Sequence, residues 1–326
     1  MKKKTKVLVT GGAGFIGSHL VARLVSKGMQ VVVLDNLSSG FIENVKDSLD
    51  KIQFVNGDVR DQNLVRKLVR DSEVVFHLAA NASVPVSVSN PEYDFQTNVI
   101  GTFNLLHSSI GQNLKSFVFA SSAAIYGSSN VALSERCVPD PVSPYGAAKL
   151  CGETLGLSYK RCFKIPFVVA RIFNVYGTRM PRYVMHDFYW KLRENPKELK
   201  VLGNGKQLRQ FCYVDDALDA LMLIADKGMD VYNIAGGEVI SMEELAKIFV
   251  EKMSPEARIT TTGKSWPGDI AKLLADISKL RKLGFRPKTN LAQGISSLIK
   301  WFEERSGSPT ESLGKEHDST SKGAHE

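Results

Sequence analysis

The sequence predicts an α/β fold, in which a doubly wound parallel sheet is followed by a smaller, mixed α/β lobe. Three observations support this prediction. Short apolar runs alternate with helical patterns, the first run ends in a glycine-rich turn, and the alternation changes after about Tyr176. Strands that alternate with helices require right-handed crossovers, and these produce a parallel sheet covered by helices on both faces.

The expected elements follow in order along the chain. Apolar runs predict strands at residues 7–9, 31–34, 52–55, 74–78, 116–119 and 167–172. Helical patterns predict helices at residues 64–69, 95–106 and 145–162. The pattern of residues 211–233 predicts a strand, then a helix, then a second strand. We therefore expect a Rossmann-type domain over residues 1–177, to which residues 211–235 return.

A change in composition sets the other boundaries. Residues 179–209 are rich in Arg, Lys, Pro and aromatic residues and have weak periodicity, so a smaller lobe is expected over residues 178–305. Within this lobe, helices are expected near 241–252 and 289–305. From Ser306 onward almost no apolar residue occurs, which predicts a disordered tail over residues 306–326.

Composition and charge favour a soluble, cytoplasmic enzyme. The net charge is +8, and apart from the run Lys2–Lys4 the Lys and Arg residues are scattered along the sequence. Scattered positive charge favours anionic small substrates over nucleic acid. The four cysteines form no C-x-x-C pair and the six histidines show no metal-ligand spacing, so reduced thiols and no metal are expected. No segment is long enough to span a bilayer, and we expect no membrane partner.

The turn from Gly11 to Gly17 is the strongest local signal for a ligand. Its glycines fit two related dinucleotide spacings, in which the backbone approaches a pyrophosphate at the amino end of a helix. Asp35 ends the next apolar run, at the offset of about twenty residues expected of a carboxylate that binds the adenosine ribose. Because this carboxylate would repel a 2′-phosphate, NAD is favoured over NADP.

A Tyr–Lys pair and a hydroxyl-rich turn predict acid–base chemistry. Ser143 reads as a helix N-cap with Pro144 at the first helical position, so Tyr145 and Lys149 share one helix face. A phenol has a pKa of about 10, and a nearby ammonium makes it a usable base at neutral pH. Ser122 lies in a hydroxyl-rich turn after the fifth expected strand.

Further motifs repeat the pattern of one enzyme family. They are TGGAGFIGSHL, Asp35-Asn36-Leu37, Gly57-Asp58-Val59, His77-Leu78-Ala79-Ala80, Asn98-Val99-x-Gly101-Thr102, SSAAIYG, SPYGAAK, the run Arg171 to Gly177, Arg209-x-Phe211-x-Tyr213-Val214-x-Asp216 and Pro267-Gly268-Asp269. From Lys6 to about Arg305, the chain resembles the extended short-chain dehydrogenase/reductases. Within that family it resembles the nucleotide-sugar 4-epimerases of the UDP-glucose/UDP-galactose type.

The resemblance implies a role for each matching residue. The catalytic residues would be Ser122, Tyr145 and Lys149. NAD would be bound by Gly11, Gly14, Phe15, Ile16, Gly17, Asp35, Asn36, Ser39, Gly40, Asp58, Val59, Leu78, Ala79, Ala80, Asn98, Tyr145, Lys149 and Phe173. The UDP-sugar would be bound by Ser122, Tyr145, Asn174, Arg209, Asp269 and Leu273. The resemblance also implies a homodimer and a place in carbohydrate metabolism.

Other activities of related sites remain open. The 4,6-dehydratases carry Asp-Glu directly after the catalytic Thr or Ser, where this chain has Ala123–Ala124. A uronate-specific epimerase or decarboxylase would need an added cation, and residues 83–87 contain no Arg. Leu273 aligns with the residue whose size, in these epimerases, determines whether a 2-N-acetyl group fits. Leu is intermediate in size, so a UDP-N-acetylhexosamine remains a possible substrate. A catalytically silent NAD-binding sensor on the same fold is the alternative of another class.

Two positions depart from the family pattern. Trp266 stands where many relatives have an Arg that reaches the diphosphate, and Gln210 replaces a common Asp beside Arg209. Either Arg182 or Arg179 supplies the missing charge, or the nucleotide is bound differently.

Overall fold

The computed structural model describes residues 4–264 and 271–306. The described chain divides into two compact units. The first contains residues 4–175, 207–240 and 271–288, and the second contains residues 176–206, 241–264 and 289–306. The segment 271–288, which the sequence analysis assigned to the smaller lobe, makes its contacts within the first unit. The expected tail over residues 307–326 lies outside the described residues.

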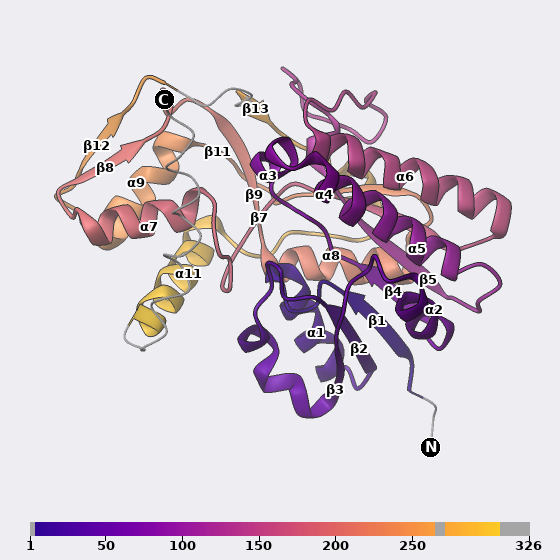
Figure 1. Ribbon diagram of the computed structural model, residues 1–326. Coiled ribbons are helices and arrows are strands. Elements are labelled where there is room, and N and C mark those ends of the chain that lie inside the picture. Colours follow the sequence, from indigo (N-terminus) through magenta and orange to yellow (C-terminus); the bar gives the residue numbers. More distant parts are fainter. Residues whose placement is uncertain (1–3, 265–270, 307–326) are drawn as a thin grey trace. The chain divides into compact units, whose positions relative to one another are not determined.

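The first unit is built on a seven-stranded sheet (Figure 1). Its strand order is β10-β6-β5-β4-β1-β2-β3, and every neighbouring pair is parallel. The strands are β1 (Lys6–Thr10), β2 (Gln30–Asp35), β3 (Ile52–Asn56), β4 (Val74–His77), β5 (Ser116–Ser122), β6 (Phe167–Ile172) and β10 (Val231–Ile234). This order confirms the predicted doubly wound parallel sheet.

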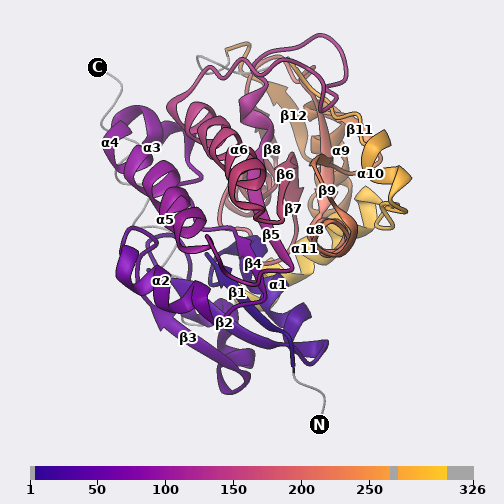
Figure 2. The same cartoon turned by 90° about the vertical axis from the view of Figure 1, so that its right-hand side faces the viewer.

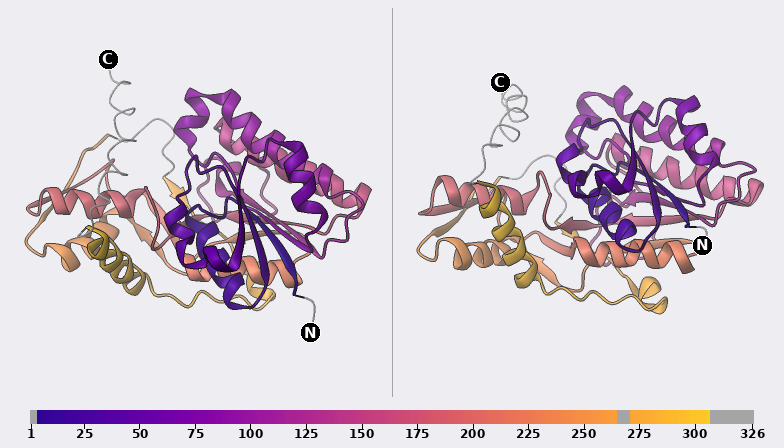
Figure 3. Two further views of the ribbon diagram at one scale, coloured as in Figure 1. Left: turned by 60° about the horizontal axis from the view of Figure 1, so that its bottom comes forward. Right: turned by 90° about the horizontal axis from the view of Figure 1, so that it is seen from below.

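Helices cover both faces of this sheet, as Figures 2 and 3 show. One face packs on α1 (Phe15–Ser26) and α8 (Val214–Lys227), through a core that includes Val7, Val9, Val31 and Val33. The other face packs on α2 (Gln62–Arg70), α5 (Gly101–Ser108) and α6 (Pro144–Phe163), through Leu8, Val32 and Leu34. Successive strand residues enter opposite cores, which explains why the strands read as continuous apolar runs.

Polar side chains fix the beginnings of the helices. Ser143 caps α6 by accepting a hydrogen bond from the backbone of Gly146, with Pro144 at the first position, as the sequence predicts. Asp61 caps α2 in the same way. The helix expected over residues 95–106 is interrupted, because a π-helical turn (Gln96–Ile100) joins α4 (Pro91–Phe95) to α5.

Shorter elements lie wholly or mostly in the first unit. They are α3 (Val84–Ser89), α10 (Ser278–Lys282) and two 3₁₀ segments at Ile42–Lys51 and Ala123–Ile125. A small sheet has the order β11-β9-β13, and β7 also pairs with β9. Its strands are β7 (Asn174–Tyr176), β9 (Leu208–Tyr213), β11 (Val239–Ser241) and β13 (Lys272–Leu273).

The second unit is a small α/β layer with an aromatic core. It contains α7 (Val184–Glu194), β8 (Glu198–Val201), α9 (Met242–Met253), β12 (Arg258–Thr261) and α11 (Leu291–Ser306). Strands β8 and β12 pair in parallel. Phe188 of α7 meets Phe249 of α9 edge to face, and Tyr189 stacks on Phe302 of α11 at 4.5 Å between ring centroids. These rings bury the apolar face of each helix.

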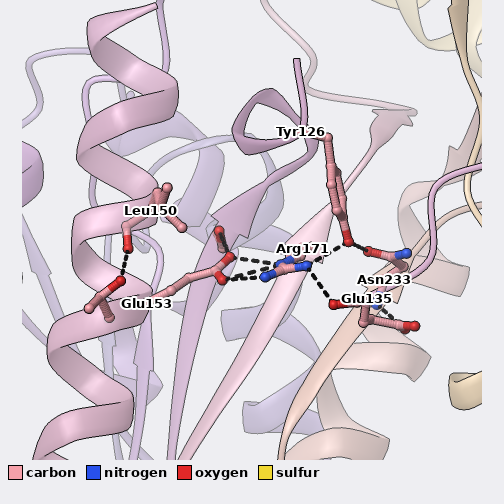
Figure 4. Close-up of polar contacts among 8 residues, drawn as sticks. Tyr126, Glu135, Leu150, Glu153, Arg171 and Asn233 are labelled. Carbon is pink, nitrogen blue, oxygen red and sulfur yellow. Dashed lines mark hydrogen bonds and ion pairs between the residues drawn. The ribbon is translucent and has the colours of Figure 1, made fainter. Parts of the chain in front are cut away.

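A buried ion pair ties α6 to β6 in the first unit (Figure 4). Arg171 Nη2 lies 2.7 Å from Glu153 Oε2, and both side chains are nearly inaccessible to water. Arg171 Nη1 donates to the Tyr126 hydroxyl, which donates in turn to Asn233 Oδ1. Ser121 also donates to Glu153. The ion pair therefore belongs to a network that joins β5, β6, β10 and α6.

Arg171→Met is expected to destabilise the protein by about 3–5 kcal/mol, because Glu153 would then be a buried charge without a cation. The matched control is Lys115→Met, which breaks the exposed pair of Lys115 with Glu73 and should cost at most ~1 kcal/mol. Urea unfolding followed by circular dichroism measures both changes. Equal losses of stability in the two variants would contradict this interpretation of the network.

Candidate functional site

The glycine turn lies where the strand order of the main sheet reverses, between β1 and β4. Gly11 has a φ of +71°, and a methyl group added there would lie 2.7 Å from the backbone nitrogen of Ala79. A methyl group at Gly17 would lie 2.0 Å from the carbonyl oxygen of Gly11. The fingerprint glycines are therefore required by close backbone contacts, at the place where doubly wound sheets bind their ligands.

The amino end of α1 fits an anion. Gly14 is its N-cap and provides no capping side chain, the first turn contains no acidic residue, and Phe15 and Ile16 open the helix. Asp35, at the end of β2, accepts hydrogen bonds from the backbone of Ala13 and Leu37, each at 2.8 Å. Burial raises the pKa of Asp35, and these two N–H groups oppose that rise. A helix amino end next to a carboxylate fits a pyrophosphate and its ribose.

The residues expected near the adenine lie after β2 and β3. Asn36 Nδ2 donates to Asp58 Oδ2 at 2.7 Å, and Arg60 forms an ion pair with the same carboxylate. The hydrogen bond from Arg60 is the main reason that the pKa of Asp58 falls to about 2. Val59 is buried. The structure therefore keeps a carboxylate charged beside the expected adenine position.

Two further residues of the expected cofactor set lie on the loop after β2. Gly40 is packed closely, since a methyl group there would lie 2.8 Å from the carbonyl carbon of Ala13. Ser39 is exposed beside it.

A neutral histidine connects the ends of β1 and β4 to α5. Thr102 donates its hydroxyl proton to the carbonyl of Asn98, so it accepts from His77 Nε2, at 2.9 Å. His77 Nδ1 then accepts from the Thr10 hydroxyl at 2.8 Å. Burial, reinforced by the charge of Lys149, lowers the pKa of His77 to about 3. His77 therefore fixes the start of the Leu78–Ala80 segment without adding a charge.

Asn98 belongs to a buried hydrogen-bonded group with Asn81 and Asp94, two residues that the sequence did not indicate. Its Nδ2 donates to the carbonyl of Asn81 and to Asp94 Oδ1, at 3.0 and 2.9 Å, and its Oδ1 accepts from the backbone of Asn81. Asp94 also accepts from Asn81 Nδ2 at 2.8 Å. The spacing of four residues between Asp94 and Asn98 was the available signal, since it places two polar groups on one helix face.

Tyr145 and Lys149 lie together on the first turns of α6. The Lys149 nitrogen lies 5.9 Å from the centre of the Tyr145 ring and donates to the carbonyl of Ala120 at 2.8 Å. Lys149 is 3% exposed. Burial is the main reason that its pKa falls to about 8, against the opposing charges of Asp94 and Glu153.

Ser122 ends β5 beside this helix. Its hydroxyl oxygen accepts from the backbone of Ala124, and a methyl group at Gly146 would lie 2.5 Å from the carbonyl oxygen of Ala124. The first turn of α6 therefore packs closely against the 3₁₀ segment Ala123–Ile125, which Ser122 caps. The structure brings the predicted Ser, Tyr and Lys to one end of the sheet.

The residues expected to bind the nucleotide sugar lie on β7, β9 and β13. Asn174 Nδ2 lies 3.5 Å from the carbonyl of Gln210, and Arg209 pairs with Leu273 across β9 and β13. Leu273 is half-buried and packs against the core of the first unit. Phe173, at the end of β6, is buried. Asp269 and Trp266 lie outside the described residues.

Gln210 has a structural role that explains one departure from the family pattern. Its Nε2 donates to the carbonyl of Gly236 at 2.6 Å, and its Oε1 accepts from the backbone of Ala275 at 2.9 Å. Both ends of the buried amide are thus occupied, and an Asp could not supply the donor.

The described part of the chain contains neither a candidate metal centre nor a candidate membrane span. In residues 4–264 and 271–306, no group of three or more His, Cys, Asp or Glu side chains is arranged to hold a metal ion. No helix in that part of the chain is both long and apolar enough to cross a membrane.

Comparisons with known proteins agree with this geometry. The family model described as GDP-mannose 4,6 dehydratase matches residues 8–298. A putative UDP-glucose 4-epimerase of Methanocaldococcus jannaschii is 36% identical, over 91% of this chain and 98% of its own length. The structure of a Thermotoga maritima UDP-glucose 4-epimerase with UDP-glucose has a TM-score of 0.87 and 35% identity, covering 92% of this chain and 99% of that one.

A third relative bears on the cofactor. The structure of a UDP-glucuronic acid 4-epimerase from Bacillus cereus, in complex with UDP-glucuronic acid and NAD, has a TM-score of 0.85 and 32% identity, covering 92% of this chain and 99% of that one. Such complexes confirm the prediction of NAD as the cofactor. Together with the matching family model, these relatives show that the chain belongs to the extended short-chain dehydrogenase/reductase family of nucleotide-sugar epimerases, dehydratases and decarboxylases.

Proposed function

We propose that this protein is a 4-epimerase that interconverts UDP-glucose and UDP-galactose through a 4-keto intermediate. One observation carries the choice among the family's reactions. Tyr145 and Lys149 lie together at the end of the sheet, whereas the two residues after Ser122 are Ala123 and Ala124. The site therefore has a base for the proton of the 4-hydroxyl, while NAD would take the hydride from C4, but it has no acid pair at that turn to eliminate water afterwards.

The expected cofactor residues would each bind one part of NAD. The amino end of α1, from Gly14 to Gly17, would hold the pyrophosphate, and Asp35 would hold the adenosine ribose. Asp58 and Val59 would contact the adenine, with Leu78–Ala80, Asn98 and Phe173 lining the remainder. When bound, NAD accepts a hydride from the substrate and gives it back within one catalytic cycle.

Tyr145 would act as the general base at the sugar's 4-hydroxyl. Below about pH 8 the buried Lys149 is an ammonium, and its charge favours the phenolate form of Tyr145. The Ser122 hydroxyl would donate to O4 as negative charge develops there. When the ketone is reduced, Tyr145 returns the proton to O4.

Inversion at C4 requires the sugar ring to turn while the nucleotide remains bound. Asn174 and Arg209 would hold the diphosphate, and Asp269 would hold the UDP ribose. These contacts are remote from C4, so they bind both sugars equally and leave the ring free to present either face. We further propose that the enzyme is a cytoplasmic homodimer of carbohydrate metabolism.

Each alternative substrate differs from UDP-glucose in one chemical group. A uronate would bring a carboxylate, and α3, which follows Ser83, contains no basic residue. An N-acetylhexosamine would bring a bulky C2 substituent, which the proposal places beside Leu273. A silent NAD-binding sensor would have no need for Ser122, Tyr145 and Lys149 together.

The reaction itself tests the proposal. Incubated with UDP-galactose and no added reductant, the purified protein should form UDP-glucose without net NADH. Nuclear magnetic resonance of the sugar region distinguishes the products. A 4-keto-6-deoxyhexose would instead establish a dehydratase, and binding of several UDP-sugars without conversion would establish a sensor.

The catalytic pair predicts two large losses of rate. Tyr145→Phe and Lys149→Met should each lower kcat by at least ~100-fold, the scale for a positioned acid or base. Tyr159→Phe, on the same helix, is the matched control and should keep native turnover. Steady-state kinetics with UDP-galactose measures all three. Near-native turnover in Tyr145→Phe would eliminate the proposed base.

The choice of sugar should depend on Leu273. Leu273→Ser should narrow the preference for UDP-glucose over UDP-N-acetylglucosamine, by an amount within the roughly 10–200-fold range of steric discrimination. Leu274→Ser is the companion variant, because an alignment shifted by one residue would give this role to Leu274, the next residue along the chain. The ratio of kcat/KM for the two substrates is the measurement, since it does not depend on how much enzyme is folded. No change in this ratio for Leu273→Ser would remove Leu273 from the substrate pocket.

A further inference from the structure

The segment that follows β2 encloses the carbonyl group of Ala13, which lies in the glycine turn. The backbone N–H of Phe41 donates to the Ala13 oxygen at 3.1 Å, and the side-chain amide of Asn44 donates to the same oxygen at 2.9 Å. A methyl group at Gly40 would lie 3.0 Å from that oxygen, so the segment also packs directly on it. Three residues of one segment thus converge on a single peptide group.

The nitrogen of Ala13 is fixed from the end of β2. Its N–H donates to Asp35 Oδ2 at 2.8 Å, and Ala13 itself is fully buried. Both polar atoms of Ala13 are therefore occupied within the protein. The N–H groups of the first turn of α1, which have no partner within the helix, are the donors that follow along the chain.

Asn44 is the member of this group whose contact depends on its side chain. Phe41 donates through its backbone, which almost any residue could do, whereas the bond from Asn44 needs an amide. Asn44 is buried in the 3₁₀ segment Ile42–Lys51, which packs against α1 (Figure 1). Its amide thus links this segment to the turn that begins α1.

The direction of the Ala13 carbonyl matters for an anion. A carbonyl oxygen carries partial negative charge and would repel a pyrophosphate, whereas the N–H groups at the amino end of α1 attract one. The bonds from Phe41 and Asn44 hold the Ala13 oxygen toward the segment after β2. A turn that is already held in this orientation loses less conformational freedom when the anion binds.

We propose that Asn44 is a positioning residue for the cofactor: its side-chain amide keeps the Ala13 carbonyl turned toward the segment after β2, and so keeps the glycine turn ready for the pyrophosphate of NAD. Asn44 acts through the turn and need not touch NAD. The inference goes beyond the proposed function, because bound NAD would serve an epimerase, a dehydratase or a decarboxylase alike.

Asn44→Leu separates the hydrogen bond from the shape. Leu has nearly the same size and branching but no donor, and the Ala13 oxygen keeps its bond from Phe41, so no buried carbonyl is left without a partner. The full-length protein, treated with charcoal to remove bound nucleotide, is titrated with NAD and with ADP-ribose by calorimetry. Both affinities should fall by roughly 3–10-fold, the scale for one hydrogen bond. Native affinities would overturn the proposal.

Adenosine distinguishes positioning of the turn from general damage to the site. It has the adenine and ribose of NAD but no phosphate. Its dissociation constant, measured by a nuclear magnetic resonance titration, should therefore be the same in Asn44→Leu and in the native protein. Equal losses of affinity for adenosine and for ADP-ribose would contradict the proposal.

Asn233→Leu is the matched control for the loss of a buried amide. Asn233 Nδ2 donates to the carbonyls of Leu133 and Asp276, at 2.8 and 3.2 Å. It lies on the edge strand β10, which three other strands separate from β1. This variant should lose thermal stability and still bind NAD with native affinity. If it weakened NAD as much as Asn44→Leu does, the effect would not be specific to the turn and the proposal would fail.

A further measurement needs no ligand. In the nucleotide-free protein, hydrogen exchange followed by mass spectrometry should be faster by roughly 3–10-fold in the peptide that covers residues 11–17 of Asn44→Leu, because a less restrained turn opens more often. Native exchange in this peptide would show that the turn is held without Asn44 and would overturn the proposal. Asn44→Ala replaces Asn44→Leu in each experiment if the latter does not fold, with the same expected results.

Discussion

All seven strands of the main sheet run in one direction, and this constraint places the candidate site. Parallel strands bring their carboxyl ends to one edge, so residues far apart in sequence meet there. Gly11 follows β1, His77 ends β4 and Ser122 ends β5. Helices that begin at this edge, such as α1 and α6, direct their amino ends toward the same place. The sheet thus brings the candidate anion site and the candidate proton-transfer pair to one edge.

The chemistry of the site depends on how buried charges are stabilised. Burial keeps His77 neutral, and Arg171 and Glu153 neutralise each other. Lys149 has a backbone carbonyl as its direct partner and negative charge only at longer range. It is therefore the group in this cluster whose protonation is most easily changed. An ammonium held in that way suits a residue that must adjust the acidity of a neighbouring tyrosine.

Much of the fold and the cofactor site could be predicted because their signals are local. Glycine spacing identified Gly11–Gly17, and periodicity identified the strands of the main sheet. The signal for α7 was present in the spacing of Met185, Phe188 and Leu192, but the surrounding basic and aromatic residues obscured it. The roles of His77 and Asp94 could not be predicted, because their partners come from other elements. The π-helical turn before Gly101 was likewise not predicted; it contains Asn98, whose side chain donates to the carbonyl of Asn81.

The most direct test of the account is the pH dependence of kcat/KM for UDP-galactose in the native enzyme. The proposed mechanism requires Lys149 to be an ammonium, and this form is lost as the pH rises through about 8. The rate should therefore fall through that pH range. A rate that stayed constant up to about pH 10.4, where an exposed lysine titrates, would show that Lys149 does not control the reaction and would contradict the account.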